Sequence, residues 1–237
     1  VIEKIQRKSK YLILVFDNHL YCVIHLGMSG TLHFIGLKKK TTNLSFYGSQ
    51  SLPKKHNHII FRFKNFKLIY NDPRRFGFFK ILKNKKDYLK FFTRIGPEAI
   101  SKDFNKKYLS QILKNRTKNI KNLLLDQKLV SGLGNIYVNE ILFQAKINPF
   151  KKSYLINLDE NKRIVKYSKI ILKKAIHFGG SSIRDFKGIT GKSGNFQSEF
   201  KVYDRAKKRC SRNNCSGQIN RKIISNRSTF LCSVCQK

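Results

Sequence analysis

The sequence predicts an α+β protein of three parts: an antiparallel β domain, a helical domain and a small metal-binding module. Apolar and polar residues alternate along the first third of the 237 residues, as they do in antiparallel sheets. After about Lys86 the apolar spacing becomes that of helices, and four of the five cysteines lie in the last 28 residues. We place the domain boundaries at 1–86, 87–198 and 199–237.

Short strands joined by tight turns are expected in the first domain. The runs with strand length and alternation are Lys10–Phe16, His19–His25, Thr31–Ile35, His58–Phe63, Lys67–Tyr70 and Phe76–Leu82. Asp17-Asn18 and Asp72-Pro73 supply turn residues between such runs. The polar stretch Gly36–His56 has no periodicity and is predicted to be a loop. Cys22, alone in an apolar strand, is expected to be a small buried hydrophobe.

Four helices are expected in the second domain. They are Phe104–Leu113, Lys118–Asp126, Asn135 to about Lys146, and Asp159–Phe178. Asp103 or Ser101 is predicted to cap the first helix, whose apolar residues recur every fourth position at Phe104, Tyr108 and Ile112. The second helix is predicted to bury three residues, namely Ile120, Leu123 and Leu124.

Glycines separate these helices. Two glycines exclude a regular helix over Gln127–Gly134, and Gly179-Gly180 are predicted to end the last helix. Ser181–Gln197, rich in glycine, serine and lysine, is predicted to be a mobile loop. From Glu199 onward the strand pattern returns around the cysteines.

The charge balance indicates a polyanionic partner. The chain carries 50 Lys and Arg against 13 Asp and Glu, a net charge of +37, and such a body attracts nucleic acid. The apolar content of 41% excludes a disordered basic tail. Neither an apolar run of membrane-spanning length nor a signal-peptide pattern is present, so we expect a cytosolic protein without a membrane partner.

The terminal cysteines predict a metal site. The two pairs are Cys210 with Cys215, separated by four residues, and Cys232 with Cys235, separated by two. In a reducing cytosol such a cluster favours a metal ion over disulfides, and four thiolates can surround one zinc ion tetrahedrally. Four protein ligands leave no open position for catalysis. We therefore predict one structural zinc ion that supplies folding energy to a basic hairpin.

Three turns carry further functional signals. Gly132 and Gly134 precede a helix start, where exposed backbone amides suit a DNA phosphate, although helix packing explains the glycines equally well. Two other glycine-flanked turns present Met28, and Arg74 with Phe76. Enzymes that act on a base in duplex DNA extrude it and fill the hole with such apolar wedges and guanidinium groups. Ordinary turn chemistry is the alternative for each turn alone.

Taken together, the chain resembles the bacterial formamidopyrimidine-DNA glycosylase family, bifunctional repair enzymes for oxidised purines. The motifs that carry the resemblance, in order, are Gln6–Leu12, Gly27–Gly30, Asp72–Gly77, Gly132–Tyr137 and the C-terminal cysteines ending Cys-Gln-Lys. The resemblance implies an antiparallel β-sandwich domain truncated at its N-terminus, a helix-two-turn-helix domain and a C-terminal zinc-finger β-hairpin. It further implies damaged double-stranded DNA bound in the cleft between the domains, and we expect a monomer.

The resemblance also implies roles for individual residues. Lys10 corresponds to the lysine that reaches the lesion phosphate and donates a proton in β-elimination, and Arg227 to the finger arginine of δ-elimination. Met28, Arg74 and Phe76 correspond to the trio that fills the void and faces the orphaned cytosine. Further DNA-binding positions are His56, Arg116, Lys121 and Asn135. Thr190–Gln197 resembles the family's flexible lid over the everted base.

One departure from the family pattern concerns the nucleophile, which in the family is the amine of an N-terminal proline followed by glutamate. This sequence begins at Val1 and holds neither residue there. We expect it to be a fragment of a longer protein and inactive as given; loss of the gene's start is the alternative.

The function implied is base-excision repair by a DNA glycosylase with AP-lyase activity. Such an enzyme removes 8-oxoguanine and formamidopyrimidines and nicks the strand by β,δ-elimination. The alternatives are a catalytically inactive, zinc-stabilised protein that binds damaged DNA, and a ribosome-associated zinc ribbon, which leaves the Arg74–Phe76 turn unexplained. A relative specific for oxidised pyrimidines shares the fold, but its void-filling residues differ.

Overall fold

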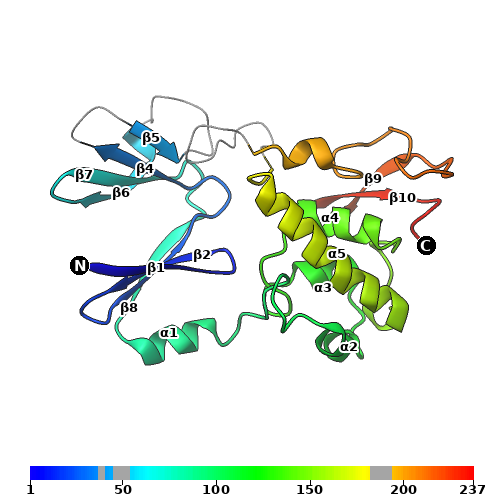
Figure 1. Cartoon of the computed structure of the whole chain (residues 1–237), viewed down its shortest axis with the longest axis horizontal. Coiled ribbons are helices and arrows are strands. Elements are labelled where there is room, and N and C mark those ends of the chain that lie inside the picture. The colour runs from blue at the N-terminus through cyan, green and yellow to red at the C-terminus, as the bar shows by residue number, and fades with distance from the viewer. Residues whose placement is uncertain (37–40, 45–53, 182–193) are drawn as a thin grey trace. The chain divides into compact units, whose positions relative to one another are not determined.

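The computed structural model describes residues 1–36, 41–44, 54–181 and 194–237. The chain forms two compact units. The β unit comprises Val1–Phe92 and Phe178–Gln197, and the helical unit comprises Thr93–His177 and Ser198–Lys237 (Figure 1). The predicted domain boundaries at 1–86, 87–198 and 199–237 follow sequence pattern rather than compactness, and they stay a prediction.

The β unit contains two four-stranded antiparallel sheets. In order across the first sheet lie β1 (Ile2–Lys8), β2 (Tyr11–Phe16), β3 (Tyr21–His25) and β8 (Phe78–Leu82). In order across the second lie β5 (Thr41–Leu44), β4 (Thr31–Gly36), β7 (Phe66–Asn71) and β6 (Asn57–Arg62). Ile13, Val23 and Tyr70 are buried, and so are Leu14, Cys22 and Ile24, so the central strands of the first sheet are covered on both faces. The predicted β-sandwich is confirmed, and Cys22 is buried in it.

Three elements of the β unit differ from the sequence prediction. Strand β1 was not predicted because its residues are mostly charged and exposed; its pairing with β2, Arg7 opposite Leu12, makes it a strand. The loop prediction for Gly36–His56 was wrong at Thr41–Leu44, which pairs with β4, and at Lys54–His56, a short 3-10 helix. The rest of that stretch, 37–40 and 45–53, lies outside the described residues.

Helix α1 (Lys85–Phe92) was also missed. The helix is short and rich in lysine, so its apolar periodicity is weak. Asn84 caps it: the Asn84 side chain accepts a hydrogen bond from the amide of Asp87 at 2.9 Å, and asparagine before a helix is a sequence signal for such a cap. The helix belongs to the β unit through its aromatic residues. Tyr88 stacks on Tyr21 with ring centroids 4.7 Å apart, and Phe92 is buried.

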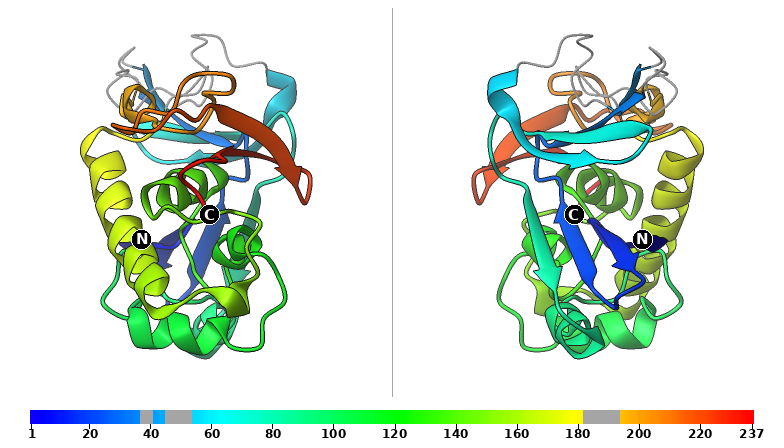
Figure 2. Two further views of the ribbon diagram at one scale, coloured as in Figure 1. Left: turned by 90° about the vertical axis from the view of Figure 1, so that its right-hand side faces the viewer. Right: turned by 90° about the vertical axis from the view of Figure 1, so that its left-hand side faces the viewer.

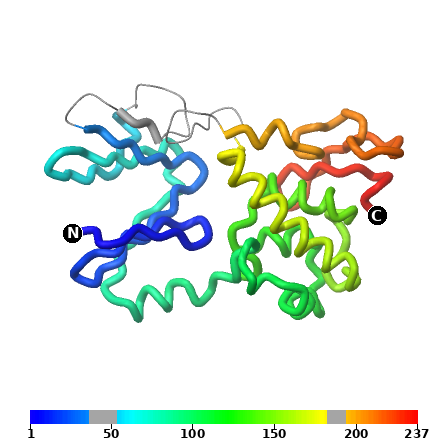
Figure 3. Tube along the Cα trace, in the orientation of Figure 1, coloured from blue at the N-terminus to red at the C-terminus, as the bar shows by residue number. Residues whose placement is uncertain are grey.

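Four helices and a hairpin form the helical unit. They are α2 (Lys106–Leu113), α3 (Ile120–Leu125), α4 (Asn135–Gln144), α5 (Leu158–His177), β9 (Ile219–Ile224) and β10 (Arg227–Cys232). Two further 3-10 helices span Ser153–Leu155 and Phe196–Glu199. In Figure 3 the tube of α5 runs alongside the other helices of this unit, and Figure 2 shows β9 and β10 as a twisted ribbon in orange and red. None of the described helices has the length and apolar character needed to cross a membrane.

The prediction for the first of these helices was partly wrong. Neither Asp103 nor Ser101 caps α2: the side chain of Asn105 accepts the amide hydrogen of Tyr108 at 3.0 Å, so the helix begins at Lys106. Within α2 the buried residues are Leu109 and Leu113, and Phe104, which lies ahead of the helix, is buried as well.

The other helices follow the prediction more closely. Helix α3 buries Ile120, Leu123 and Leu124 as expected, and Gln127–Gly134 is not helical. Gly179 and Gly180 follow α5 with φ of +72° and +89°, conformations that favour glycine and end a helix. The predicted loop Ser181–Gln197 lies outside the described residues over 182–193, which include the first half of Thr190–Gln197. At its end, Phe196–Glu199 forms a 3-10 helix.

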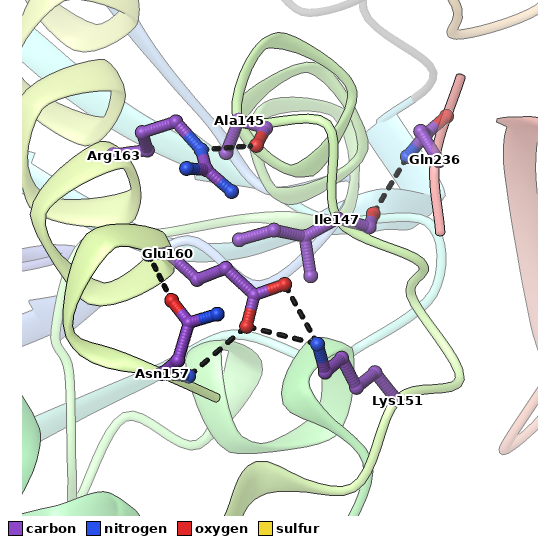
Figure 4. A network of polar contacts seen from close by, with 7 residues as sticks. All are labelled: Ala145, Ile147, Lys151, Asn157, Glu160, Arg163 and Gln236. Carbon is purple, nitrogen blue, oxygen red and sulfur yellow. Dashed lines mark hydrogen bonds and ion pairs between the residues drawn. The ribbon is translucent and has the colours of Figure 1, made fainter. Parts of the chain in front are cut away.

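A network of polar contacts fixes the start of α5 (Figure 4). Asn157 and Glu160 form a reciprocal capping box, each side chain accepting the other's amide hydrogen at 2.9–3.0 Å. Lys151 adds an ion pair to Glu160 at 2.7 Å. Nearby, the Gln236 side chain donates to the carbonyl of Ile147 at 2.8 Å, which ties the last residues of the chain to the helices.

Candidate nucleic-acid interface and metal centre

Four cysteines converge at the base of the β9–β10 hairpin. The Sγ atoms of Cys210, Cys215, Cys232 and Cys235 all lie within 4.8 Å of one another. The closest pairs are Cys210 with Cys235 at 3.8 Å and Cys215 with Cys232 at 3.7 Å. A tetrahedral site with Zn–S bonds of ~2.3 Å has S···S edges of ~3.8 Å, so the cluster fits one zinc ion. The predicted structural zinc centre is confirmed in its ligand set.

The wide spacing of the first cysteine pair has a structural use. Arg212, between Cys210 and Cys215, donates to the carbonyls of Phe143 and Gln144 at 2.5 and 3.1 Å. Its guanidinium also lies over the ring of Phe143, 4.7 Å from the centroid. These carbonyls are at the C-terminal end of α4, where cations are favoured. The four-residue spacing therefore docks the metal centre on α4.

Helices α3 and α4 hold the other end of the hairpin. Lys121 is fully buried, and its Nζ donates to the carbonyl of Ser228 at 2.9 Å and to Oγ1 of Thr229 at 2.7 Å. The Asn135 side chain donates to the same Ser228 carbonyl at 3.1 Å. The hairpin turn precedes Arg227, which is exposed. The structure thus brings together three residues predicted from the family pattern: Lys121, Asn135 and Arg227.

Burial of Lys121 gives a testable pH dependence. Desolvation, aided by the charge of Arg227, lowers the pKa of Lys121 from 10.5 to about 8. Between these values the unfolded chain binds more protons than the folded chain, so the stability owed to this residue rises with pH. Relative to Lys121→Met, the free energy of unfolding of the wild type should rise by roughly 2 kcal/mol between pH 7 and 9.5 in urea titrations. A pH-independent difference would contradict the shift.

On the β unit, two surface turns bring the predicted void-filling residues together. Met28 is 61% exposed and Phe76 57% exposed. The Arg74 guanidinium lies over the Phe76 ring, 4.6 Å from its centroid, and its Nη1 is 3.8 Å from the sulfur of Met28. The three residues, 48 positions apart at most in sequence, form one exposed cluster, which we call the wedge cluster.

The remaining predicted residues lie on both units. Lys10 is exposed in the turn between β1 and β2. The pKa of His25 is lowered, first by the burial of His25 itself and then by the positive charge of Lys10. His56 ends a 3-10 helix, and its carbonyl accepts the amide hydrogen of Asp72 at 3.0 Å, next to the wedge cluster. Arg116 is exposed in the helical unit between α2 and α3.

Sequence reasoning missed the buried polar residues beneath the wedge cluster. Asp72, Ser29 and Tyr70 are buried, and the hydroxyls of Ser29 and Tyr70 both donate to the Asp72 carboxylate. Asp72 was noted as a turn residue and as part of the Asp72–Gly77 motif, without a role of its own. A carboxylate directly after a buried strand end, at the start of a glycine-flanked turn, was the available signal for this network.

Comparison with known proteins decides the family. Residues 1–79 match the model of the formamidopyrimidine-DNA glycosylase N-terminal domain, and residues 95–187 match that of the formamidopyrimidine-DNA glycosylase H2TH domain. The formamidopyrimidine-DNA glycosylase of Roseobacter denitrificans is 40% identical over 238 residues, 100% of this chain and 83% of the relative. The chain belongs to the formamidopyrimidine-DNA glycosylase family.

Other formamidopyrimidine-DNA glycosylases and solved structures agree. The protein from Wolbachia pipientis of Culex pipiens is 38% identical over 237 residues, 100% of this chain and 82% of that protein. The Lactococcus lactis Fpg bound to abasic-site DNA matches with a TM-score of 0.85 and 34% identity, covering 100% and 82%. MutM bound to DNA containing carbocyclic 8-oxo-G matches with a TM-score of 0.83 and 33% identity, with the same coverage. The family predicted from the motifs is confirmed.

Proposed function

We propose that this family member is a base-excision DNA repair glycosylase with AP-lyase activity that removes oxidised purines from double-stranded DNA. The wedge cluster carries the proposal, because an apolar pair beside a guanidinium at an exposed turn suits the hole left by an extruded base. Solved relatives that share the fold hold DNA with an abasic site or an 8-oxoguanine analogue. The bacterial cytosol and nucleoid are the matching location.

In this proposal the two units supply different contacts. Lys10 and Arg227 are the catalytic cations, and Met28, Arg74 and Phe76 enter the base stack. The phosphate and groove contacts come from His56, Arg116 and Asn135. Lys121, assigned to the same set by the family pattern, is buried and instead supports the hairpin through Ser228 and Thr229. The zinc ion, held by the four cysteines, stabilises the hairpin that carries Arg227 and takes no part in the chemistry, because its four positions are filled by thiolates.

Binding to duplex DNA should weaken steeply with salt. Contacts from lysine and arginine to phosphates release counterions, so the logarithm of the binding constant should fall by about 0.9 per decade of salt for each phosphate contacted. Arg116→Gln should flatten the slope by about 0.9, since it removes one contact, while Arg116→Lys should keep the wild-type slope. Fluorescence anisotropy titrations between low and physiological salt measure both slopes. Salt-independent affinity would remove DNA as the partner.

Covalent trapping tests the glycosylase activity itself. By the family resemblance the nucleophile is an N-terminal proline amine, which attacks C1′ of the damaged nucleoside, expels the base and forms a Schiff base that borohydride reduces. A fusion that places a Pro-Glu-initiated N-terminal segment of a family member ahead of Val1 should be trapped on 8-oxoguanine DNA. The same fusion with alanine in place of that proline should not be trapped. Failure of the proline fusion, with DNA binding intact, would favour the second candidate.

The second candidate is a zinc-stabilised protein that binds damaged DNA without excising bases. One observation favours it: the best-defined parts of the site, the exposed wedge cluster and the four-cysteine centre, serve DNA binding rather than base removal. The two candidates make the same binding predictions and differ only in trapping. Trapping of the 237-residue chain alone would point to another amine, such as that of Lys10, as the nucleophile.

A further inference from the structure

Beneath the wedge cluster lies a buried carboxylate that the proposed chemistry does not use. Asp72 is fully buried and both of its oxygens accept hydrogen bonds. Oδ1 accepts from the Ser29 hydroxyl and from the amide of Arg74, the latter at 3.2 Å. Oδ2 accepts from the Tyr70 hydroxyl at 2.8 Å and from the amide of Gly77 at 2.9 Å. A carboxylate offers about four acceptor positions, and all of them are filled here.

These four donors come from different parts of the fold. Ser29 belongs to the turn that carries Met28, whereas the amides of Arg74 and Gly77 belong to the turn that carries Phe76. Tyr70 lies on β7, in the second sheet. One carboxylate therefore joins the two wedge-bearing turns to each other and to the rigid sheet behind them. Burial of Asp72 acts to raise its pKa, but the hydrogen bonds outweigh burial and lower the pKa.

The backbones of the two turns are packed without any spare room. A Cβ atom on Gly27, which has a φ of +66°, would lie 2.7 Å from the backbone of Phe76 and Gly77. A Cβ on Gly77 would lie 1.9 Å from the Tyr70 hydroxyl and 2.6 Å from the carbonyl of His25. Because the backbones approach this closely, the two turns can pack in only one arrangement, and in that arrangement Asp72 keeps all of its hydrogen-bond donors. Above them, the side chains of Met28, Arg74 and Phe76 are exposed yet already in contact with one another.

We propose that Asp72 is the positioning residue of the wedge cluster: it locks the Met28 turn and the Arg74–Phe76 turn into one preformed body that enters the base stack as a unit. Ordering of these side chains is then complete before DNA binds, which removes an entropic cost from base extrusion. The inference rests on the proposed function, since it assigns Asp72 a role through residues that contact DNA. Asp72 itself touches no DNA and is not catalytic.

Asp72→Asn tests the inference. The substitution keeps the shape, but it turns one acceptor oxygen into an N–H donor that faces other donors, so the two turns lose their common anchor. The preference for 8-oxoguanine duplex over undamaged duplex should fall about tenfold or more, while affinity for undamaged duplex, which resides in phosphate contacts, stays within about twofold. Asp87→Asn, the same chemical change in the same unit, should alter neither.

A double-mutant cycle separates positioning from a general loss of structure. Because Asp72 acts through the wedge residues, Asp72→Asn should have no further effect on lesion preference once Phe76→Ala is present. Additive effects in the cycle would overturn the inference. If Asp72→Asn does not fold, Ser29→Ala and Tyr70→Phe decide the question, because each removes one hydrogen-bond donor to Asp72. Each should lower the preference for the lesion duplex by less than Asp72→Asn would. An unchanged preference in both variants would contradict the positioning role.

The same experiment distinguishes this inference from the proposed function. A wild-type protein without lesion preference contradicts the proposed function. A wild-type protein with preference, and a folded Asp72→Asn variant that keeps it, contradicts only the positioning role.

Discussion

Phe76→Ala should abolish lesion recognition while sparing most of the affinity for undamaged DNA. Phe76 is 57% exposed, so its removal costs the folded protein little, but it leaves the space of an extruded base unfilled. Unstacking one base step costs a few kcal/mol, and the wedge offsets that cost, so its loss should shift the extrusion equilibrium by about two orders of magnitude. Fluorescence of a base analogue at the lesion site, titrated in parallel with anisotropy, separates extrusion from binding.

The matched control for this variant is Phe63→Ala, an exposed aromatic residue of the same unit that stacks on Phe66. It should leave both readouts unchanged. Arg74→Ala should instead relax discrimination of the base opposite the lesion, because a guanidinium meets the edge of that base only after its partner has left the stack. Equal loss of affinity for damaged and undamaged duplex in Phe76→Ala, with extrusion intact, would make the residue an ordinary surface contact.

Cys232→Ser should unfold the hairpin and much of its support in the helical unit. Zinc binding to structural four-ligand sites is worth on the order of 10 kcal/mol, comparable with the whole stability of a domain. Cys232 and Phe230 of the hairpin share one apolar cluster with Phe143 of α4, so loss of the ion should reach that helix. DNA affinity should fall with it, because Arg227 and the Lys121 contacts depend on the hairpin.

The β unit should not respond to this change. Its core, built around residues such as Ile13 and Val23, belongs to a separate unit. In calorimetry of Cys232→Ser, the unfolding transition of the helical unit should therefore be lost or move to a lower temperature, while that of the β unit stays unchanged. Zinc content is measured alongside. Cys22→Ser, a cysteine of the β unit, should leave the zinc content unchanged. A single cooperative transition that moves as a whole in Cys232→Ser would show that the units do not unfold independently.

Local chemistry made several elements of this fold predictable. The α5 helix follows from an amphipathic run that ends at Gly179 and Gly180, both of which have positive φ. The zinc cluster follows from cysteine spacing, since thiolates have few other uses at such density. Helix α1 and strand β1 were missed because charged, exposed sequences carry little periodicity. Tertiary contacts decide their structure: the burial of Phe92 stabilises α1, and pairing with β2 makes β1 a strand.

The candidate site divides in the same way. Exposed residues such as Met28 and Phe76 were identified because they form recognisable motifs with their neighbours. Asp72 was noted in a turn and in a family motif but was given no role, because its four donors come from residues up to 43 positions away and no local pattern indicates that convergence. Lys121 was assigned a phosphate contact from the family pattern. Its burial and its bonds to Ser228 and Thr229 became visible only once α3 and the hairpin were in place.

The most direct test of the central claim is the ratio of two dissociation constants. They are measured for one duplex sequence, with guanine or 8-oxoguanine opposite cytosine, at a single physiological salt concentration. A protein whose wedge cluster fills the hole left by an extruded oxidised purine should bind the lesion duplex at least about tenfold more tightly, a difference of about 1.4 kcal/mol. Phe76→Ala should return the ratio to one. A ratio of one for the wild-type protein would contradict recognition of oxidised purines and leave only a basic surface that binds any duplex.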